Sequence, residues 1–330
     1  MAEQTKMQTL VEAMRDALKE EMRRDERVVL WGEDLVSMGG PFKQTEGLYE
    51  EFGGDRIRDT AITEIAIVDM AIGAAVTGLR PVAFLMFASF VPLCGDALLL
   101  KLGSWWKTFD YKGPVPVVIN TMIAQGFGFG PDHTLSPEAF LIHSPNLKVV
   151  LPSTAADAKG LLKAAIRDDY PVVFLSHRAT FFEKEPVPTE DYIVPLGKAD
   201  VKREGNDVTI VAYSAMVIKA LAAAEALSKE GISVEVVDLR SLVPMDVDAM
   251  VKSVKKTGRL LIAHEAMKRG GVAGEIAFRV IEAAPDVVRT MKAPIKRVGA
   301  KNIALPHGVE LEKSITPQVD DIVKAVKEMV

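Results

Sequence analysis

The feature that most constrains the fold of this chain is the alternation of short apolar runs with helix-length segments. The runs are rich in valine, isoleucine and leucine without alternating polar residues, as expected for strands buried on both faces of a sheet. Those in the first half are Val28–Trp31, Pro81–Phe87, Val115–Asn120, Lys148–Leu151 and Val172–Leu175. The candidate helices between them are Glu64–Thr77, Cys94–Trp106 and Ala155–Arg167. This order predicts an α/β fold with a parallel sheet covered by helices.

An amphipathic helix is expected before the first strand. Its apolar positions recur at helical spacing. They are Met7, Leu10, Val11, Met14, Leu18 and Met22.

Two domains are expected, because 330 residues are more than one hydrophobic core usually serves. Proline and charged residues concentrate from Phe182 to Asp200, which disfavours helix and central strand and indicates a linker. A second α/β pattern follows, with strands expected at Val208–Tyr213, Val234–Leu239 and Leu260–His264, and helices at Met216–Glu230, Val247–Lys255, Val272–Ala284 and Gln318–Met329. We predict a first domain over residues 1–185, a linker over 186–205 and a second domain over 206–330.

Composition excludes several classes of protein. The single cysteine, Cys94, cannot form an internal disulfide and suits a reducing compartment. The net charge is −5 with both signs interspersed, so no nucleic-acid-binding surface is indicated. No apolar run reaches the ~18 residues that span a bilayer, and the first residues lack the layout of a secretory signal. A cytoplasmic protein without membrane contact is expected.

Glu64 is a lone carboxylate in a stretch dominated by isoleucine, valine and alanine. Burial among apolar groups would penalise its ionised form and suit it to proton exchange near neutrality. The alternative is an ordinary carboxylate at a hydrated helix start, where the helix dipole favours negative charge. From this stretch alone the second explanation is favoured.

A glycine-rich segment, Gln125–Ser136, follows the strand expected at Val115–Asn120 and contains His133. Ligands of open α/β proteins lie at the ends of parallel strands. The spacing Gly126-x-Gly128-x-Gly130 is not the dinucleotide fingerprint. A histidine after such a loop is more often structural than catalytic. The chain has no zinc spacing, no Gly-x-Ser-x-Gly elbow and no Walker motif.

Taken together, the motifs resemble the beta subunit of the thiamine-diphosphate-dependent first component of 2-oxo acid dehydrogenase complexes. This family includes the pyruvate, branched-chain and acetoin dehydrogenases. The resemblance covers nearly the whole chain. It rests on Gly32-Glu33-Asp34, Arg56-Ile57-Arg58-Asp59-Thr60, Gly78-Leu79-Arg80-Pro81-Val82, Leu147-Lys148-Val149-Val150, Val243-Pro244-Met245-Asp246 and Thr316-Pro317-Gln318-Val319.

The resemblance implies a pyrimidine-binding domain followed by a transketolase C-terminal-like domain. It also implies an α2β2 heterotetramer in which thiamine diphosphate lies between an alpha and a beta subunit. The alpha subunit would hold the diphosphate and Mg²⁺, and a lipoyl-bearing acyltransferase is the further partner. The expected reaction is oxidative decarboxylation of a 2-oxo acid with acyl transfer to lipoyl.

The resemblance also assigns roles to single residues. Glu64 matches the glutamate that hydrogen-bonds the aminopyrimidine ring nitrogen and promotes its imino tautomer. His133 matches the active-site histidine, which acts on substrate or acyl transfer. The positions expected to line the aminopyrimidine are Ile62, Met86, Phe87 and Phe90. A potassium site of mainly backbone carbonyls matches Val117, Ala165, Ile166, Asp168 and Tyr170.

Several residues depart from the family pattern near the expected pocket. Met86 stands where glutamine is usual, Ser89 replaces an aspartate, and Asn120 replaces an arginine. The flanks of His133 also differ, and Tyr170 replaces an asparagine. These changes leave two alternatives open. One is an acyl transferase or lyase with a non-standard substrate or acceptor, and the other is a non-catalytic stabilising subunit.

Overall fold

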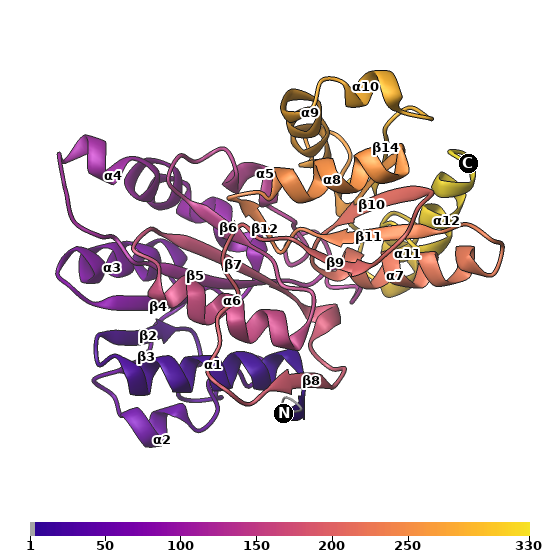
Figure 1. The fold of residues 1–330 in the computed structure, drawn as a ribbon. Coiled ribbons are helices and arrows are strands. Elements are labelled where there is room, and N and C mark those ends of the chain that lie inside the picture. The colour runs from indigo at the N-terminus through magenta and orange to yellow at the C-terminus, as the bar shows by residue number, and fades with distance from the viewer. Residues whose placement is uncertain (1–3) are drawn as a thin grey trace. The chain divides into compact units, whose positions relative to one another are not determined.

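The computed structural model describes residues 4–330, which divide into two compact units (Figure 1). The first unit comprises residues 4–124 and 140–196, and the second comprises residues 125–139 and 197–330. The short helix α5 (Glu138–Leu141) lies across this division. The sequence placed the first domain at residues 1–185, whereas the glycine-rich segment 125–139 packs with the second unit. Chain-order reasoning does not anticipate such a crossing.

The first unit is built on a parallel sheet with strand order β6-β7-β5-β4-β2-β3. The strands are β2 (Val28–Gly32), β3 (Ile57–Asp59), β4 (Arg80–Phe84), β5 (Val118–Ile123), β6 (Lys148–Val150) and β7 (Val172–His177). The helical segments are α1 (Leu10–Arg24), α2 (Leu48–Phe52), α3 (Glu64–Val76), η1 (Ala88–Cys94), η2 (Asp96–Leu102), α4 (Gly103–Thr108), α6 (Ala155–Arg167) and η3 (Arg178–Thr180). This architecture confirms the α/β fold expected from the sequence.

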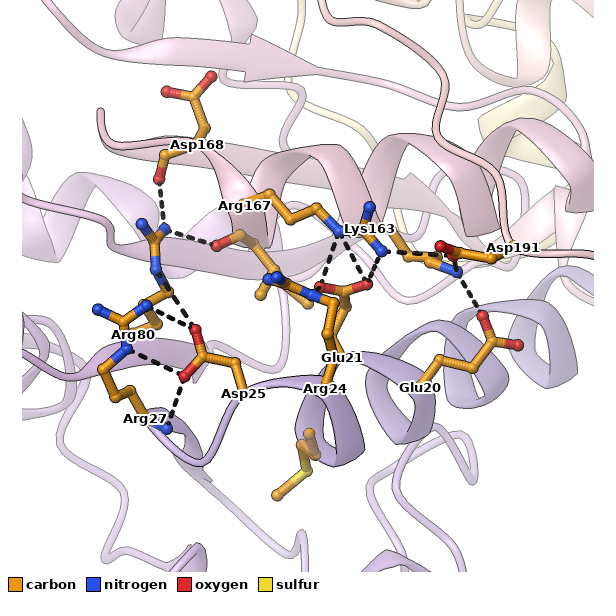
Figure 2. Close-up of polar contacts among 12 residues, drawn as sticks. Glu20, Glu21, Arg24, Asp25, Arg27, Arg80, Lys163, Arg167, Asp168 and Asp191 are labelled. Atoms are coloured by element: carbon orange, nitrogen blue, oxygen red, sulfur yellow. Dashed lines mark hydrogen bonds and ion pairs between the residues drawn. The ribbon is translucent and has the colours of Figure 1, made fainter.

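One face of this sheet forms a core with α1 and α6. Alternate strand residues such as Leu30, Val82 and Phe84 point into it, as the two-residue period of a strand requires. Ion pairs also join the two helices, since the buried carboxylate of Glu21 receives three hydrogen bonds from Arg167, at 2.6, 3.0 and 3.1 Å (Figure 2). Arg24 donates to the same carboxylate at 2.7 Å.

Two segments of the first unit differ from the sequence expectation. The helix expected at Cys94–Trp106 is divided into the 3-10 segment η1, the π-helical turn η2 and α4. Pro92 lies inside η1, where it cannot donate a backbone hydrogen bond. A Cβ at Gly103 would lie only 2.4 Å from Ser144 Oγ, so α4 begins where the chain packs closely against Ser144. Within the expected linker, β8 (Glu185–Pro188) pairs antiparallel with β1 (Thr5–Gln8), an edge position that tolerates proline.

The N-terminal helix begins later than its apolar stripe suggests. Met7 belongs to β1 and is exposed, while α1 starts at Leu10 after the N-cap Thr9. Thr9 and Glu12 form a capping box, with Glu12 N donating to Thr9 Oγ1 at 3.2 Å and Thr9 N donating to Glu12 Oε2 at 2.8 Å.

The second unit contains a five-stranded sheet of order β14-β13-β10-β11-β9, parallel except for β9. Its strands are β9 (Asp200–Arg203), β10 (Val208–Ala212), β11 (Val234–Asp238), β13 (Leu260–Met267) and β14 (Lys296–Ala300), and a short strand β12 (Ser241–Val243) lies outside this sheet. The helices are α7 (Ala215–Ser228), α8 (Val247–Thr257), α9 (Ala273–Ala283), α10 (Val287–Thr290), α11 (Val309–Lys313) and α12 (Val319–Lys327). Helices α7 and α12 enclose a core with β10 and β11.

Candidate functional site

The carboxyl ends of neighbouring strands bring several predicted residues to one edge of the first sheet. Glu64 begins α3 shortly after β3, while Met86, Phe87 and Phe90 follow β4. Strand β2 lies between β3 and β4, and all three are parallel. This edge is where open α/β sheets bind ligands.

The Glu64 side chain is buried, with only 8% of its surface exposed. Among residues 4–330, no donor lies within hydrogen-bonding distance of its carboxylate. The charge of Glu64 reaches its neighbours, because it contributes, after burial, to raising the pKa of the Cys94 thiol to about 12. A buried carboxyl without a protein donor remains available to a ligand.

Glu33 is a second buried carboxyl at this edge. It directly follows β2, and its Oε1 has no hydrogen-bond partner among the described residues. Burial raises the pKa of Glu33, and the charges of Glu64 and Asp34 raise it further. Sequence reasoning did not select Glu33 as a site residue, although a carboxylate at the end of a buried strand was a usable signal.

A small cavity opens beside Glu33. Met86 and Asn120, two of the departures from the family pattern, line it together with Ser176. Asn120 is buried, and its Oδ1 has no partner among the described residues. Two of the unusual residues therefore share one space, whereas Ser89 and Tyr170 do not line it.

Aromatic rings lie beyond this cavity. Phe87 contacts Phe42 and Phe90 edge to face, with ring centroids 6.4 and 5.9 Å apart. Phe87 is buried and Phe90 is partly buried. Ile62, which is expected to line the aminopyrimidine of the cofactor, is 80% exposed.

His133 lies in the second unit, whereas Glu64 lies in the first. Its Nδ1 is 3.2 Å from Asp132 Oδ2, and this hydrogen bond is the main cause that lowers the pKa of Asp132. One third of the His133 side chain is exposed, and the ring of Phe129 lies edge-on to it at 6.4 Å. The imidazole is thus partly exposed, and its Nδ1 faces the Asp132 carboxylate.

The residues expected to bind potassium meet around the end of α6. Arg80 Nη1 donates to the carbonyls of Ile166 and Asp168, at 2.9 and 3.0 Å (Figure 2). Lys148 Nζ pairs with the Asp168 carboxylate at 2.5 Å and lies 5.4 Å from the centre of the Tyr170 ring. Two of the expected carbonyls therefore already face a side-chain cation, and the fit to a potassium ion is partial. Val117 and Ala165 are buried.

Metal-ligand clusters and membrane-spanning helices are both absent from the described part of the chain. Within residues 4–330, no three or more His, Cys, Asp and Glu side chains are grouped so that they could hold a metal ion. None of the helices in that range combines the length and the apolar character needed to cross a bilayer.

Comparison with known proteins shows the family of this chain. The family model "Transketolase, pyrimidine binding domain" matches residues 6–182, and "Transketolase, C-terminal domain" matches residues 197–322. The 2-oxoisovalerate dehydrogenase subunit beta of Bacillus subtilis is 40% identical over 97% of both chains. The pyruvate dehydrogenase E1 component subunit beta of Staphylococcus epidermidis is 42% identical, also over 97% of both chains. The chain belongs to the family of E1 beta subunits of 2-oxo acid dehydrogenase complexes.

These are thiamine-diphosphate-dependent enzymes, so the fold and family expected from the sequence are confirmed. A solved structure titled "Split gene transketolase, inactive beta4 tetramer" superposes with a TM-score of 0.80, at 27% identity over 98% of both chains. Two E1 beta subunits of Bacillus subtilis that are named for different substrates are 40% and 39% identical to this chain. Overall similarity therefore does not select the substrate.

Proposed function

We propose that this chain is the beta subunit of an E1 enzyme that oxidatively decarboxylates a 2-oxo acid and transfers the acyl group to lipoyl. Thiamine diphosphate, shared with an alpha subunit in an α2β2 heterotetramer, supplies the electron sink for cleavage beside the carbonyl. The observation that carries the proposal is the Glu64 carboxyl, which is buried and receives no hydrogen bond from another described residue. Such a group is available to hydrogen-bond the aminopyrimidine ring nitrogen, the role that the resemblance implies.

Other residues of the chain support this assignment. Glu33 adds a second buried carboxyl, whose pKa is raised by burial. Phe87 and Phe90 offer ring surface against which an aromatic heterocycle packs. His133, with one nitrogen held by Asp132, is the residue proposed to act on substrate or acyl transfer.

An alpha-type partner is supported by apolar surface near α3. Ile62, Ile65, Leu93 and Leu100 are all exposed, with exposed fractions from 53 to 80%. An apolar surface of this kind commonly marks a protein interface.

We assign Mg²⁺ and the diphosphate to the alpha subunit. The potassium ion, the cytoplasmic location and the lipoyl-bearing acyltransferase remain predictions.

The substrate is expected to depend on the cavity beside Glu33. Asn120 in place of an arginine removes a cation that could pair with a carboxylate, and Met86 removes an amide. These two changes favour, as a second candidate, an enzyme of the same cofactor with a different carbonyl substrate or acyl acceptor.

The test is reconstitution with an alpha-type E1 subunit. Dye reduction would be measured with pyruvate, 2-oxoisovalerate, longer 2-oxo acids and acetoin. The proposal expects turnover of at least one 2-oxo acid, and turnover of acetoin alone would support the second candidate. Glu64→Gln is expected to lower kcat by about a hundredfold or more without loss of assembly.

Glu50→Gln is the matched control, because Glu50 is an exposed glutamate of α2 in the same unit. It should leave activity unchanged. Equal activity of Glu64→Gln and wild-type tetramers would instead support a stabilising subunit without catalytic residues.

A further inference from the structure

The glycine-rich segment that carries His133 is held by one buried carboxylate. Gly126 N donates to Glu312 Oε1 at 2.7 Å, and Gly128 N donates to Glu312 Oε2 at 2.6 Å. Glu312 belongs to α11, and its side chain is fully buried. The two partners are 184 and 186 residues apart from Glu312 in the chain, so only the fold brings them together.

No counter-ion accompanies this carboxylate. Within residues 4–330, no lysine, arginine or histidine nitrogen lies within ion-pairing distance of Glu312. Removing a charge from water without an opposite charge is costly unless hydrogen bonds compensate it. Among the described residues, the side-chain oxygens of Glu312 have only the two backbone N–H groups of the loop as partners. A group retained at this cost indicates a specific task.

The loop backbone is shaped to fit Glu312 and the residues around it. Gly126 and Gly128 have φ values of +92° and +72°, which side chains other than glycine rarely adopt. At Gly128 a Cβ would also lie 2.8 Å from Val309 N, so α11 and the loop are in close contact. Gly308 N donates back to Gly128 O at 3.1 Å.

Further contacts connect the part of the loop held by Glu312 with His133. The carbonyl of Gly130 accepts hydrogen bonds from Thr134 Oγ1 at 2.7 Å and from His133 N at 3.3 Å. Phe129 bridges to His307, which precedes α11, and its ring also contacts the His133 ring. Glu312 is therefore linked to the imidazole through backbone hydrogen bonds of the loop and does not contact the imidazole directly.

We propose that Glu312 is a positioning residue for His133. Its carboxylate fixes the loop 125–134, so that the imidazole is held in one orientation. The proposal rests on the proposed function only for the role of His133. The two hydrogen bonds from the loop to Glu312, which form a clamp, lie within the second unit whatever the role of His133. The experiment therefore needs one readout for the clamp and another for catalysis.

Hydrogen exchange of the reconstituted tetramer reads the clamp. In Glu312→Gln the amide of the new side chain is a donor facing a donor, so exchange over residues 125–134 is expected to quicken about tenfold or more. Glu310→Gln is the matched control, because Glu310 lies on the same helix, is exposed and pairs with Lys313. Unchanged exchange in Glu312→Gln, or an equal change in Glu310→Gln, would overturn the proposal whether or not the tetramer is active.

A double-mutant cycle reads catalysis. Glu312→Gln should lower kcat about tenfold to a hundredfold with little change in KM, and should have no further effect in a His133→Ala background. A general structural role would lower activity in both backgrounds, and that result refutes positioning. Gly126→Ala carries the same cycle if Glu312→Gln does not assemble, since its added methyl meets nothing within 4 Å and only the backbone conformation is disturbed.

Discussion

Replacing Glu138 by glutamine tests the consequence of burying a carboxyl without a counter-ion. Glu138 begins α5, has 1% of its surface exposed, and its Oε2 has no hydrogen-bond partner among the described residues. Burial, together with the charge of Glu265, raises the pKa of Glu138 from 4.5 to about 7. Glutamine has the same shape but does not titrate.

The sign and size of the effect follow from linkage. Because the folded state keeps the proton to higher pH than the unfolded state, unfolding becomes more favourable as pH rises from 4.5 to about 7. The full loss is about 3 kcal/mol, since each tenfold change in proton affinity between the two states is worth about 1.4 kcal/mol. Between pH 5.5 and pH 8, about 2 kcal/mol of this remains to be lost.

The measurement is the difference in unfolding free energy between wild type and Glu138→Gln, from denaturant titrations at both pH values. From pH 5.5 to pH 8, the unfolding free energy of the variant relative to that of the wild type should rise by about 2 kcal/mol. The variant must be compared with the wild type because other groups also titrate. Burial lowers the pKa of His264 to about 4, so the effect of His264 on stability has the opposite sign over the acid range. Glu282→Gln, an exposed change in the same unit, is the control. Parallel pH profiles of wild type and Glu138→Gln would refute the reasoning.

Two further predictions concern α1. Thr9→Ala removes the capping box and should lower the unfolding free energy by about 1 kcal/mol in a urea titration, whereas an equal loss in Thr5→Ala would show that the cap is not the cause. Glu21→Ala leaves Arg167 and Arg24 without their shared carboxylate and should cost about 2 kcal/mol, a value reduced because both arginines are partly exposed. A loss of that size should lower the midpoint of thermal unfolding, and an unchanged midpoint would contradict the role of Glu21.

Local sequence pattern predicted the regular elements well where the pattern was strong. Helix α6 was expected at Ala155–Arg167 and occupies those residues, because Thr154 caps its start and apolar residues follow at helical spacing. The strand expected at Val115–Asn120 lies instead at Val118–Ile123. An apolar run shows that a strand is buried, but pairing with β4 and β7 decides where the strand begins and ends.

The candidate site shows the same division. From its apolar stretch alone Glu64 was expected to be an ordinary carboxylate at a hydrated helix start, and its site role was implied by the resemblance. The fold buries it. Its role, and that of His133, remain predictions. Ile62 was expected in the same pocket and is exposed in this chain, so its role also stays a prediction.

The amino-acid sequence by itself determined the fold class and the family, and it predicted the edge of the sheet at which a ligand would bind. These depend on periodicity and on motifs that are short and continuous in the chain. Only the tertiary structure decided that Glu33 lies near enough to Glu64 for their charges to interact, and that Glu312 holds the loop of His133. Both depend on contacts between distant residues, and the strength of a buried charge depends on its surroundings in space rather than on its neighbours in the chain.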